Sequence, residues 1–151
     1  MSVVTATIEI AADPMRVWTA AMTPENTPVW VSVVRGVGEH SDGDFRVGYE
    51  MEQRLCLRGV PFTVNWKLTA CDAPHYARWE GRGPARSKAI TEDWLTPTDD
   101  GGTHFEYRNE FKAPLGPLGS VASRALVGGV PEREAKASLA ELKRRLEAGE
   151  W

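Results

Sequence analysis

The chain has 151 residues, of which 42% are hydrophobic and 26% are charged, and its formal net charge is -3. This length and composition predict a single globular domain over residues 1–151, and the absence of a basic excess argues against nucleic acid as a partner. The apolar runs are too short for a membrane span and no charged-then-apolar leader opens the chain, so we expect a cytoplasmic protein.

The first thirty residues predict a strand followed by short helices. Residues 3–11 alternate between apolar and polar side chains, which is typical of a strand with one buried face. Asp13 and Pro14 then indicate a helix start, because an aspartate caps the first turn and proline fits its first position. We expect this helix to run through Met22 and to be followed by a second short helix or turn that ends near Trp30.

The middle of the chain predicts six further strands, separated by short turns rich in glycine, proline and aspartate. They are expected at residues 31–39, 47–58, 60–68, 75–81, 87–96 and 103–113. Consecutive strands joined by short turns pair antiparallel, so they should form one antiparallel sheet. In the strand 87–96, either the odd-numbered set with Asp93 or the even-numbered set with Glu92 could point inward, and the pattern leaves this open.

Residues 131–148 predict a long amphipathic helix. Its apolar stripe consists of Ala135, Leu139, Leu142 and Leu146. Such a helix is not stable bare in water, so we expect it to lie against a curved sheet formed by the strands. One helix stripe cannot fill the concave side of a sheet of this size, and we therefore expect a cavity. Whether the helix continues through Gly128 and Gly129 is left open, because paired glycines break or kink a helix.

The two cysteines are expected to be free thiols. If the strands 47–58 and 60–68 pair about a turn near Gly59, Cys56 lies opposite Thr63 and too far from Cys71 for a disulfide. Free, half-buried cysteines of this kind usually contribute to packing.

Four segments of the chain carry a resemblance to a known family. They are residues 10–18 (Ile-Ala-Ala-Asp-Pro-Met-Arg-Val-Trp), Trp30, the Gly102-Thr103 hairpin, and residues 139–147 (Leu-Ala-Glu-Leu-Lys-Arg-Arg-Leu-Glu). In this order and spacing they resemble the helix-grip proteins of the START and birch-pollen-allergen (SRPBCC) superfamily, most closely its polyketide cyclase/dehydrase branch. The resemblance implies an α+β fold, in which a curved antiparallel sheet of about seven strands wraps around a long C-terminal helix. It also implies a deep, mainly apolar pocket between sheet and helix and no obligatory cofactor.

Aromatic and polar side chains on the expected inner faces are the candidate ligand-binding residues. They are Trp30, Tyr49, Trp66, Trp79, Tyr107 and Asn109. Each strand aromatic could equally be core packing, but tryptophan and tyrosine can also line a pocket and keep one polar group for a ligand. Tyr107 and Asn109 are the best candidates, because an inward hydroxyl or amide needs a hydrogen-bond partner when it is buried. The resemblance places Trp30 at the mouth of the pocket.

Motifs for metal, phosphate or nucleophile chemistry are not found in the sequence. His40, His75 and His104 have no metal-ligand spacing, so we expect no metal site. No glycine-rich phosphate loop follows a strand, and no Gly-x-Ser-x-Gly elbow occurs. The sequence therefore does not predict phosphoryl transfer or classical nucleophilic catalysis.

The leading hypothesis is binding of a small or medium hydrophobic ligand, such as a polyketide-like, aromatic or lipid molecule, without catalysis. One alternative is a polyketide aromatase/cyclase or dehydrase that uses acid–base catalysis in the same cavity. Its candidate groups are Glu52, Arg54, Glu92, Asp93 and Tyr107, and no catalytic residue is assigned. Another alternative is a protein-interaction domain with a collapsed cavity. An unpaired edge strand would also allow a homodimer.

Overall fold

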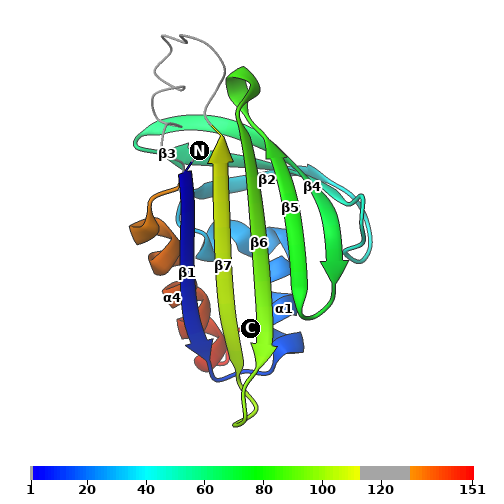
Figure 1. Ribbon diagram of the computed structural model, residues 1–151, viewed down its shortest axis with the longest axis vertical. Coiled ribbons are helices and arrows are strands. Elements are labelled where there is room, and N and C mark those ends of the chain that lie inside the picture. Colours follow the sequence, from blue (N-terminus) through cyan, green and yellow to red (C-terminus); the bar gives the residue numbers. More distant parts are fainter. Residues whose placement is uncertain (1, 113–129) are drawn as a thin grey trace.

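The computed structural model describes residues 2–112 and 130–151, and its centre is one seven-stranded antiparallel sheet (Figure 1). The strands are β1 (Ser2–Ile10), β2 (Val34–His40), β3 (Glu50–Leu57), β4 (Val60–Asp72), β5 (Tyr76–Arg82), β6 (Lys88–Pro97) and β7 (Thr103–Lys112). Their order across the sheet is β1-β7-β6-β5-β4-β3-β2, so β1 and β2 are the edges. The first strand thus closes against the last, while the other strands pair with their neighbours in sequence.

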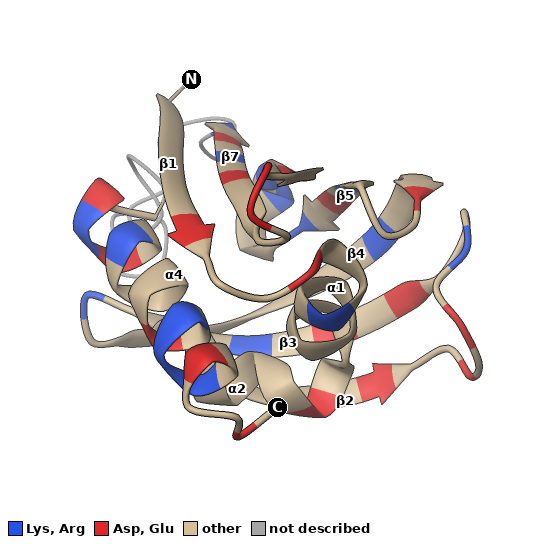
Figure 2. Ribbon diagram, turned by 90° about the horizontal axis from the view of Figure 1, so that it is seen from below, with Lys and Arg blue, Asp and Glu red and all other residues tan. Residues whose placement is uncertain are grey.

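The helices lie within the curve of this sheet (Figure 2). Between β1 and β2 come α1 (Pro14–Met22), the 3-10 turn η1 (Pro24–Asn26) and the short α2 (Thr27–Trp30), and the long α4 (Glu132–Glu147) ends the fold. A further 3-10 turn, η2 (Pro84–Arg86), connects β5 and β6. This arrangement confirms the expected helix-grip architecture.

The C-terminal end of α4 is held by polar contacts to the first turn of α1 and to the connection between β1 and α1. The Arg16 guanidinium donates to the carbonyl of Leu146 at 2.7 Å and to that of Trp151 at 2.6 Å. The Glu147 carboxylate accepts from the backbone N–H of Ala11 at 3.0 Å. The Leu146 carbonyl also accepts from the Gly149 N–H at 3.2 Å, so Arg16 adds a charged donor there, and these bonds tie the end of α4 to the start of the chain's helical segment.

Two strand starts differ from the expectation by more than one residue. The strand expected from Val31 begins at Val34, because a turn bonded from the Val34 N–H to the Val31 carbonyl follows α2. The strand expected from Val47 begins at Glu50, because Gly48 has a φ of 96° and interrupts the alternation. Val47 is consequently exposed, whereas the next odd-numbered residue, Tyr49, is buried.

The turn between β3 and β4 also shifts the expected register. Arg58 and Gly59 both have positive φ, 52° and 78°, which makes a two-residue hairpin turn of the kind that matches strand twist. The hairpin centre therefore lies between these residues, and Cys56 pairs with Pro61 rather than Thr63. Both cysteines are free.

No helix within residues 2–112 and 130–151 is both long and apolar enough to cross a membrane. The continuity of the final helix through 128–129 concerns residues outside those that the structure describes.

Candidate functional site

A cavity of about 120 Å³ lies between the short helices and the inner face of the sheet. Most of its wall is apolar and comes from α1, α2, the chain before β2 and the inner face of β3. The aromatic side chains in the wall are Trp30, Phe45, Trp66, Trp79 and Tyr107. The other polar side chains in it are Thr27, Gln53, Thr91, Asp93 and Asn109. A second hollow of about 50 Å³ shares Leu55, Trp66, Asn109 and Val130 with the cavity and extends it toward Phe111.

Cross-strand pairing brings four polar side chains together on the cavity floor. Asp93 of β6 pairs with Tyr107 of β7, and Thr91 pairs with Asn109. Directly opposed residues share a face of the sheet, and all four of these residues line the cavity. The sequence did not decide which side chains of β6 point inward, and the structure shows that the odd-numbered ones do. This set also includes Leu95, which is 1% exposed.

Asp93 is a buried carboxyl group in this floor. Its exposed fraction is 8%, and burial raises its pKa to about 7, with the neighbouring charge of Glu92 acting in the same direction. Among the described lining residues there is no lysine, arginine or histidine that would stabilise the ionised form. Asp93 therefore exchanges its proton near neutral pH, where the carboxyl groups of exposed aspartates are fully ionised.

Tyr107, directly beside Asp93 on the floor, is a neutral hydrogen-bond donor. Burial raises the pKa of its phenol well above the ordinary value, and the charge of Asp93 raises it further, while a hydrogen bond with Asn109 acts in the opposite direction. A carboxyl group that titrates near neutrality and a phenol that stays protonated thus lie side by side on the same sheet face.

Two tryptophans of the wall hold unused donors. The indole N–H groups of Trp30 and Trp66 are buried, and neither has a hydrogen-bond partner in the described part of the chain. A buried donor without a partner costs roughly 1–3 kcal/mol, and a hydrogen-bond acceptor on a ligand would offset this cost.

The position of Trp66 depends on a glycine in the neighbouring strand. Trp66 pairs with Gly81 across β4 and β5, and a Cβ atom built on Gly81 would lie 2.6 Å from Cζ3 of the indole. The ring therefore lies directly over the Gly81 backbone, in space that any side chain would occupy.

Phe45 closes the cavity from the β2–β3 loop and is supported by two other aromatics. Its ring meets Tyr49 edge-on with centroids 4.6 Å apart, and it meets Trp79 in the same way at 5.4 Å. The hydroxyl of Tyr49 points away to His40, with 3.0 Å between the oxygen and Nδ1. Tyr49 is thus not part of the cavity wall and instead packs behind Phe45 and Trp79.

The sequence-based candidates divide accordingly. Trp30, Trp66, Trp79, Tyr107 and Asn109 line the cavity, and Tyr49 does not. The sequence analysis did not select Phe45, Gln53 or Thr91 as site residues, although they line it too. Gln53 follows the alternation of β3 and could have been found from it. Phe45 lies in a loop, where no periodic signal exists.

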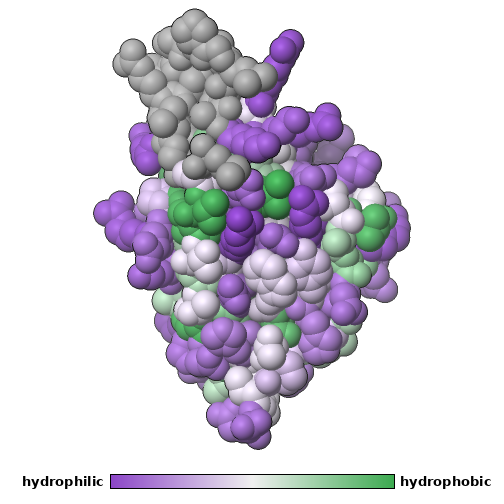
Figure 3. All heavy atoms as spheres, in the orientation of Figure 1, coloured by the Kyte–Doolittle hydropathy of each residue, from purple (hydrophilic) through white to green (hydrophobic). Residues whose placement is uncertain are grey.

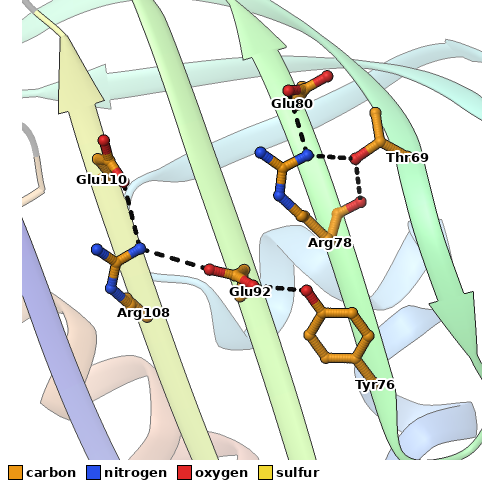
Figure 4. A network of polar contacts seen from close by, with 7 residues as sticks. All are labelled: Thr69, Tyr76, Arg78, Glu80, Glu92, Arg108 and Glu110. Atoms are coloured by element: carbon orange, nitrogen blue, oxygen red, sulfur yellow. Dashed lines mark hydrogen bonds and ion pairs between the residues drawn. The ribbon is translucent and has the colours of Figure 1, made fainter.

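Several acid–base candidates lie on the outer face of the sheet, away from the cavity. Glu92 accepts a hydrogen bond from the Tyr76 hydroxyl at 2.5 Å and pairs with Arg108 at 3.4 Å, and Arg108 also pairs with Glu110 (Figure 4). This outer face is mainly hydrophilic (Figure 3). Among the described residues, no three histidine, cysteine, aspartate or glutamate side chains are grouped to hold a metal ion.

Comparison with known proteins agrees with this architecture. A family model described as polyketide cyclase / dehydrase and lipid transport matches residues 1–147. An uncharacterized protein of Mycobacterium tuberculosis is 28% identical over 131 residues, which cover 83% of this chain and 91% of that protein.

Solved structures show the same fold at low sequence identity. TTHA0849 of Thermus thermophilus is 17% identical with a TM-score of 0.76, covering 99% of both chains. DR_A0006 of Deinococcus radiodurans is 16% identical with a TM-score of 0.72, again covering 99% of both. Ara h 8.0201 is 15% identical with a TM-score of 0.66, covering 97% of both. These structures show the fold, and the family match shows that the chain belongs to the polyketide cyclase / dehydrase and lipid transport family.

Proposed function

We propose that this protein binds one small, largely apolar molecule with a hydrogen-bond acceptor in the cavity between α1, α2 and the sheet. The observation that carries the proposal is that the buried indole N–H groups of Trp30 and Trp66, in a mainly apolar wall, have no hydrogen-bond partner among the described residues. Buried polar groups in folded proteins normally have partners, and exceptions call for an explanation. A ligand carbonyl, ether or hydroxyl oxygen supplies one here.

The size of the cavity limits the ligand. About 120 Å³, with a further 50 Å³ adjoining it, suits a molecule of one or two small rings better than a long lipid chain. The alternative of an interaction domain with a collapsed interior is less well supported, because the polar floor faces open space. A filled core would instead bury apolar side chains there.

Binding of two matched probes tests the proposal. Acetophenone, which has a carbonyl oxygen, should bind more tightly than ethylbenzene, which lacks one, when both are titrated by calorimetry. Trp66→Phe and Trp30→Phe should each lower the affinity for acetophenone by about three- to tenfold, which corresponds to one net hydrogen bond. Neither variant should change the affinity for ethylbenzene much. Trp18→Phe is the matched control, since this tryptophan is buried in α1 outside the cavity wall. Equal affinity for the two probes in the wild type would contradict the proposal.

A second function is favoured by the Asp93–Tyr107 pair. A carboxylate with a pKa near 7 is suited to act as a general base, and a neutral phenol beside it can donate to an oxygen that becomes negative. Asp93 would take a proton from a carbon next to a ligand carbonyl, and the electron pair left behind would form an enolate held by Tyr107. This is the first step that a cyclase or dehydrase requires.

Hydrogen exchange separates catalysis from binding alone. If Asp93 is a base, the methyl protons of acetophenone should exchange with deuterium in D2O faster in the presence of the protein, as followed by proton NMR. Asp93→Asn should abolish this acceleration, whereas Glu92→Gln on the outer face should not. Binding without any acceleration would leave the carrier function alone.

A further inference from the structure

The cavity wall carries one acidic side chain and no basic one, and this indicates which charge a ligand should carry. This inference rests on the proposed function. Asp93 is the one carboxyl group among the described residues of the wall, and no basic side chain there balances it. No hydrogen bond or ion pair to its side chain comes from the rest of the described chain. An uncompensated buried carboxylate is costly, and partners from within the protein or from a ligand normally offset that cost.

The surroundings of Asp93 leave room for such a partner. Its paired residue in β5 is Ala77, whose side chain is a single methyl group, and its paired residue in β7 is Tyr107. Trp79 stands two residues along β5 from Ala77 on the same face. Asp93 therefore has an aromatic residue on the same sheet face in each neighbouring strand, and it lines the cavity.

Aromatic rings favour one kind of partner for a carboxylate. The faces of tryptophan, tyrosine and phenylalanine rings attract cations, with about 0.5–2 kcal/mol per contact depending on desolvation. Trp66 and Trp79 line the cavity from the strands beside the polar floor, and Trp30 of α2 and Phe45 of the β2–β3 loop add two more aromatic side chains. A cavity lined by aromatic side chains around a single negative group is complementary to an organic cation.

We propose that the ligand carries a basic nitrogen, a protonated amine or amidine, which ion-pairs with Asp93 and packs against the aromatic side chains of the cavity. Its apolar part fills the remaining cavity, and its hydrogen-bond acceptor meets the indole N–H groups of Trp30 and Trp66. When the cation binds, any Asp93 carboxyl group that is protonated releases its proton to solvent. The bound cation and the Asp93 carboxylate then leave the cavity without net charge.

The groups around Asp93 indicate that the proton released on binding of the cation comes from Asp93. Tyr107 is the titratable group that faces it from β7, and its phenol stays protonated. Glu92, its neighbour in β6, faces the outer surface and raises the pKa of Asp93. The parts of α1, α2, β5 and the Phe45 loop that line the cavity contribute no charged side chain.

Calorimetry with isosteric probes tests this inference. At pH 8, 2-phenylethylamine, a cation, should bind about tenfold or more tightly than neutral 2-phenylethanol, as expected for a desolvated charge pair with ring contacts. Asp93→Asn should remove the preference and keep 2-phenylethanol binding, whereas the outward Glu92→Gln should keep the preference. At pH 6.5, wild-type titrations in buffers of different ionisation enthalpy should show protons released with the amine and none with the alcohol.

The outcomes distinguish the two proposals. Equal binding of amine and alcohol, or an amine preference that survives in Asp93→Asn, would overturn the basic-nitrogen ligand while leaving a small-molecule site in place. Lack of proton release in the wild type would overturn it independently of how the variant folds. If neither of these probes nor acetophenone binds, the proposed function falls together with this inference.

Discussion

The two ends of the sheet's inner face differ in how they are filled. At one end, Phe105 of β7 pairs with Leu95 of β6 and Ile8 of β1, and Phe105 and Leu95 are at most 1% exposed. Two to four residues further along the same strands, Tyr107 and Asn109 face the cavity. The same alternation thus gives core at one end and a polar hollow at the other.

The helices explain the difference. The apolar stripe of α4 is almost fully buried, with Leu139, Leu142 and Leu146 at 0–2% exposure, and Arg16 fixes its C-terminal end. The cavity is bordered instead by the short α1 and α2, which contribute Met22 and Trp30. Where long helix side chains meet the sheet, a core forms. Val17 and Trp18 of α1 belong to this core too, and space for a ligand remains where α1 ends at Met22 and α2 follows.

Shortening one leucine at the packed end and one at the cavity tests this difference in packing, and it should give the largest change in the free energy of unfolding. Leu142→Ala should lower the free energy of unfolding by about 2–5 kcal/mol, because its fully buried site cannot collapse. Leu55→Ala removes the same atoms from a side chain that already borders both hollows, so it should cost less than half as much. Urea denaturation measures both, and equal losses would show that the cavity end is packed as tightly as the α4 end.

The pH dependence of stability sharpens the contrast at Asp93. Its pKa is raised from 3.8 to about 7 in the folded state, so the folded protein holds the proton more tightly than the unfolded chain. The wild type therefore loses stability as the pH rises from about 4 through 7, by roughly 4 kcal/mol at most. Asp93→Asn should lack this loss. The free energy of unfolding of the variant, measured in urea, should equal that of the wild type near pH 4, exceed it increasingly as the pH rises, and show a constant difference above pH 7. A constant difference between pH 4 and 8 would mean that Asp93 titrates normally.

Loss of the Arg16 anchor should loosen the packed end. Arg16→Met keeps an apolar chain but leaves the carbonyls of Leu146 and Trp151 without their charged donor, at a cost of about 1.5–3 kcal/mol. Arg35→Met is the control, because this exposed arginine makes one long bond, 3.4 Å, to the Ser32 carbonyl. Hydrogen exchange should speed up at the C-terminal end of α4 in the first variant. Unchanged protection there would contradict the anchoring role.

The smallest expected effect concerns the cavity wall. Gly81→Ala should push the Trp66 indole from its place and cost about 1–3 kcal/mol of stability, together with a shift in tryptophan fluorescence. Gly36→Ala in the edge strand β2 meets the flexible end of Arg54, which can move, so it should have little effect. Similar results for both variants would mean that Trp66 does not depend on the glycine.

Local alternation was enough to predict much of this architecture, including the inward position of Tyr107 and Asn109. It could not select the face of β6, because Ile90 and Trp94 are as apolar as Ala89 and Leu95. Pairing with β7 decides that face, since Leu95 lies opposite Phe105.

Other features depend on contacts distant in sequence. The position of Phe45 comes from its ring contacts with Tyr49 and Trp79, and a loop carries no period to reveal it. The space for Trp66 comes from Gly81 on the next strand. The size of the cavity depends on how far α1 and α2 stand from the sheet, which no single segment encodes.

Native mass spectrometry of the freshly purified protein, before and after incubation with 2-phenylethylamine, tests the central claim that the hollow end holds a small molecule. The wild type should show a mass above that of the chain, released on denaturation. Thr91→Phe, which fills the cavity floor while keeping a native circular dichroism spectrum, should show the chain mass alone. Identical spectra for the two proteins, with or without the amine, would contradict the claim.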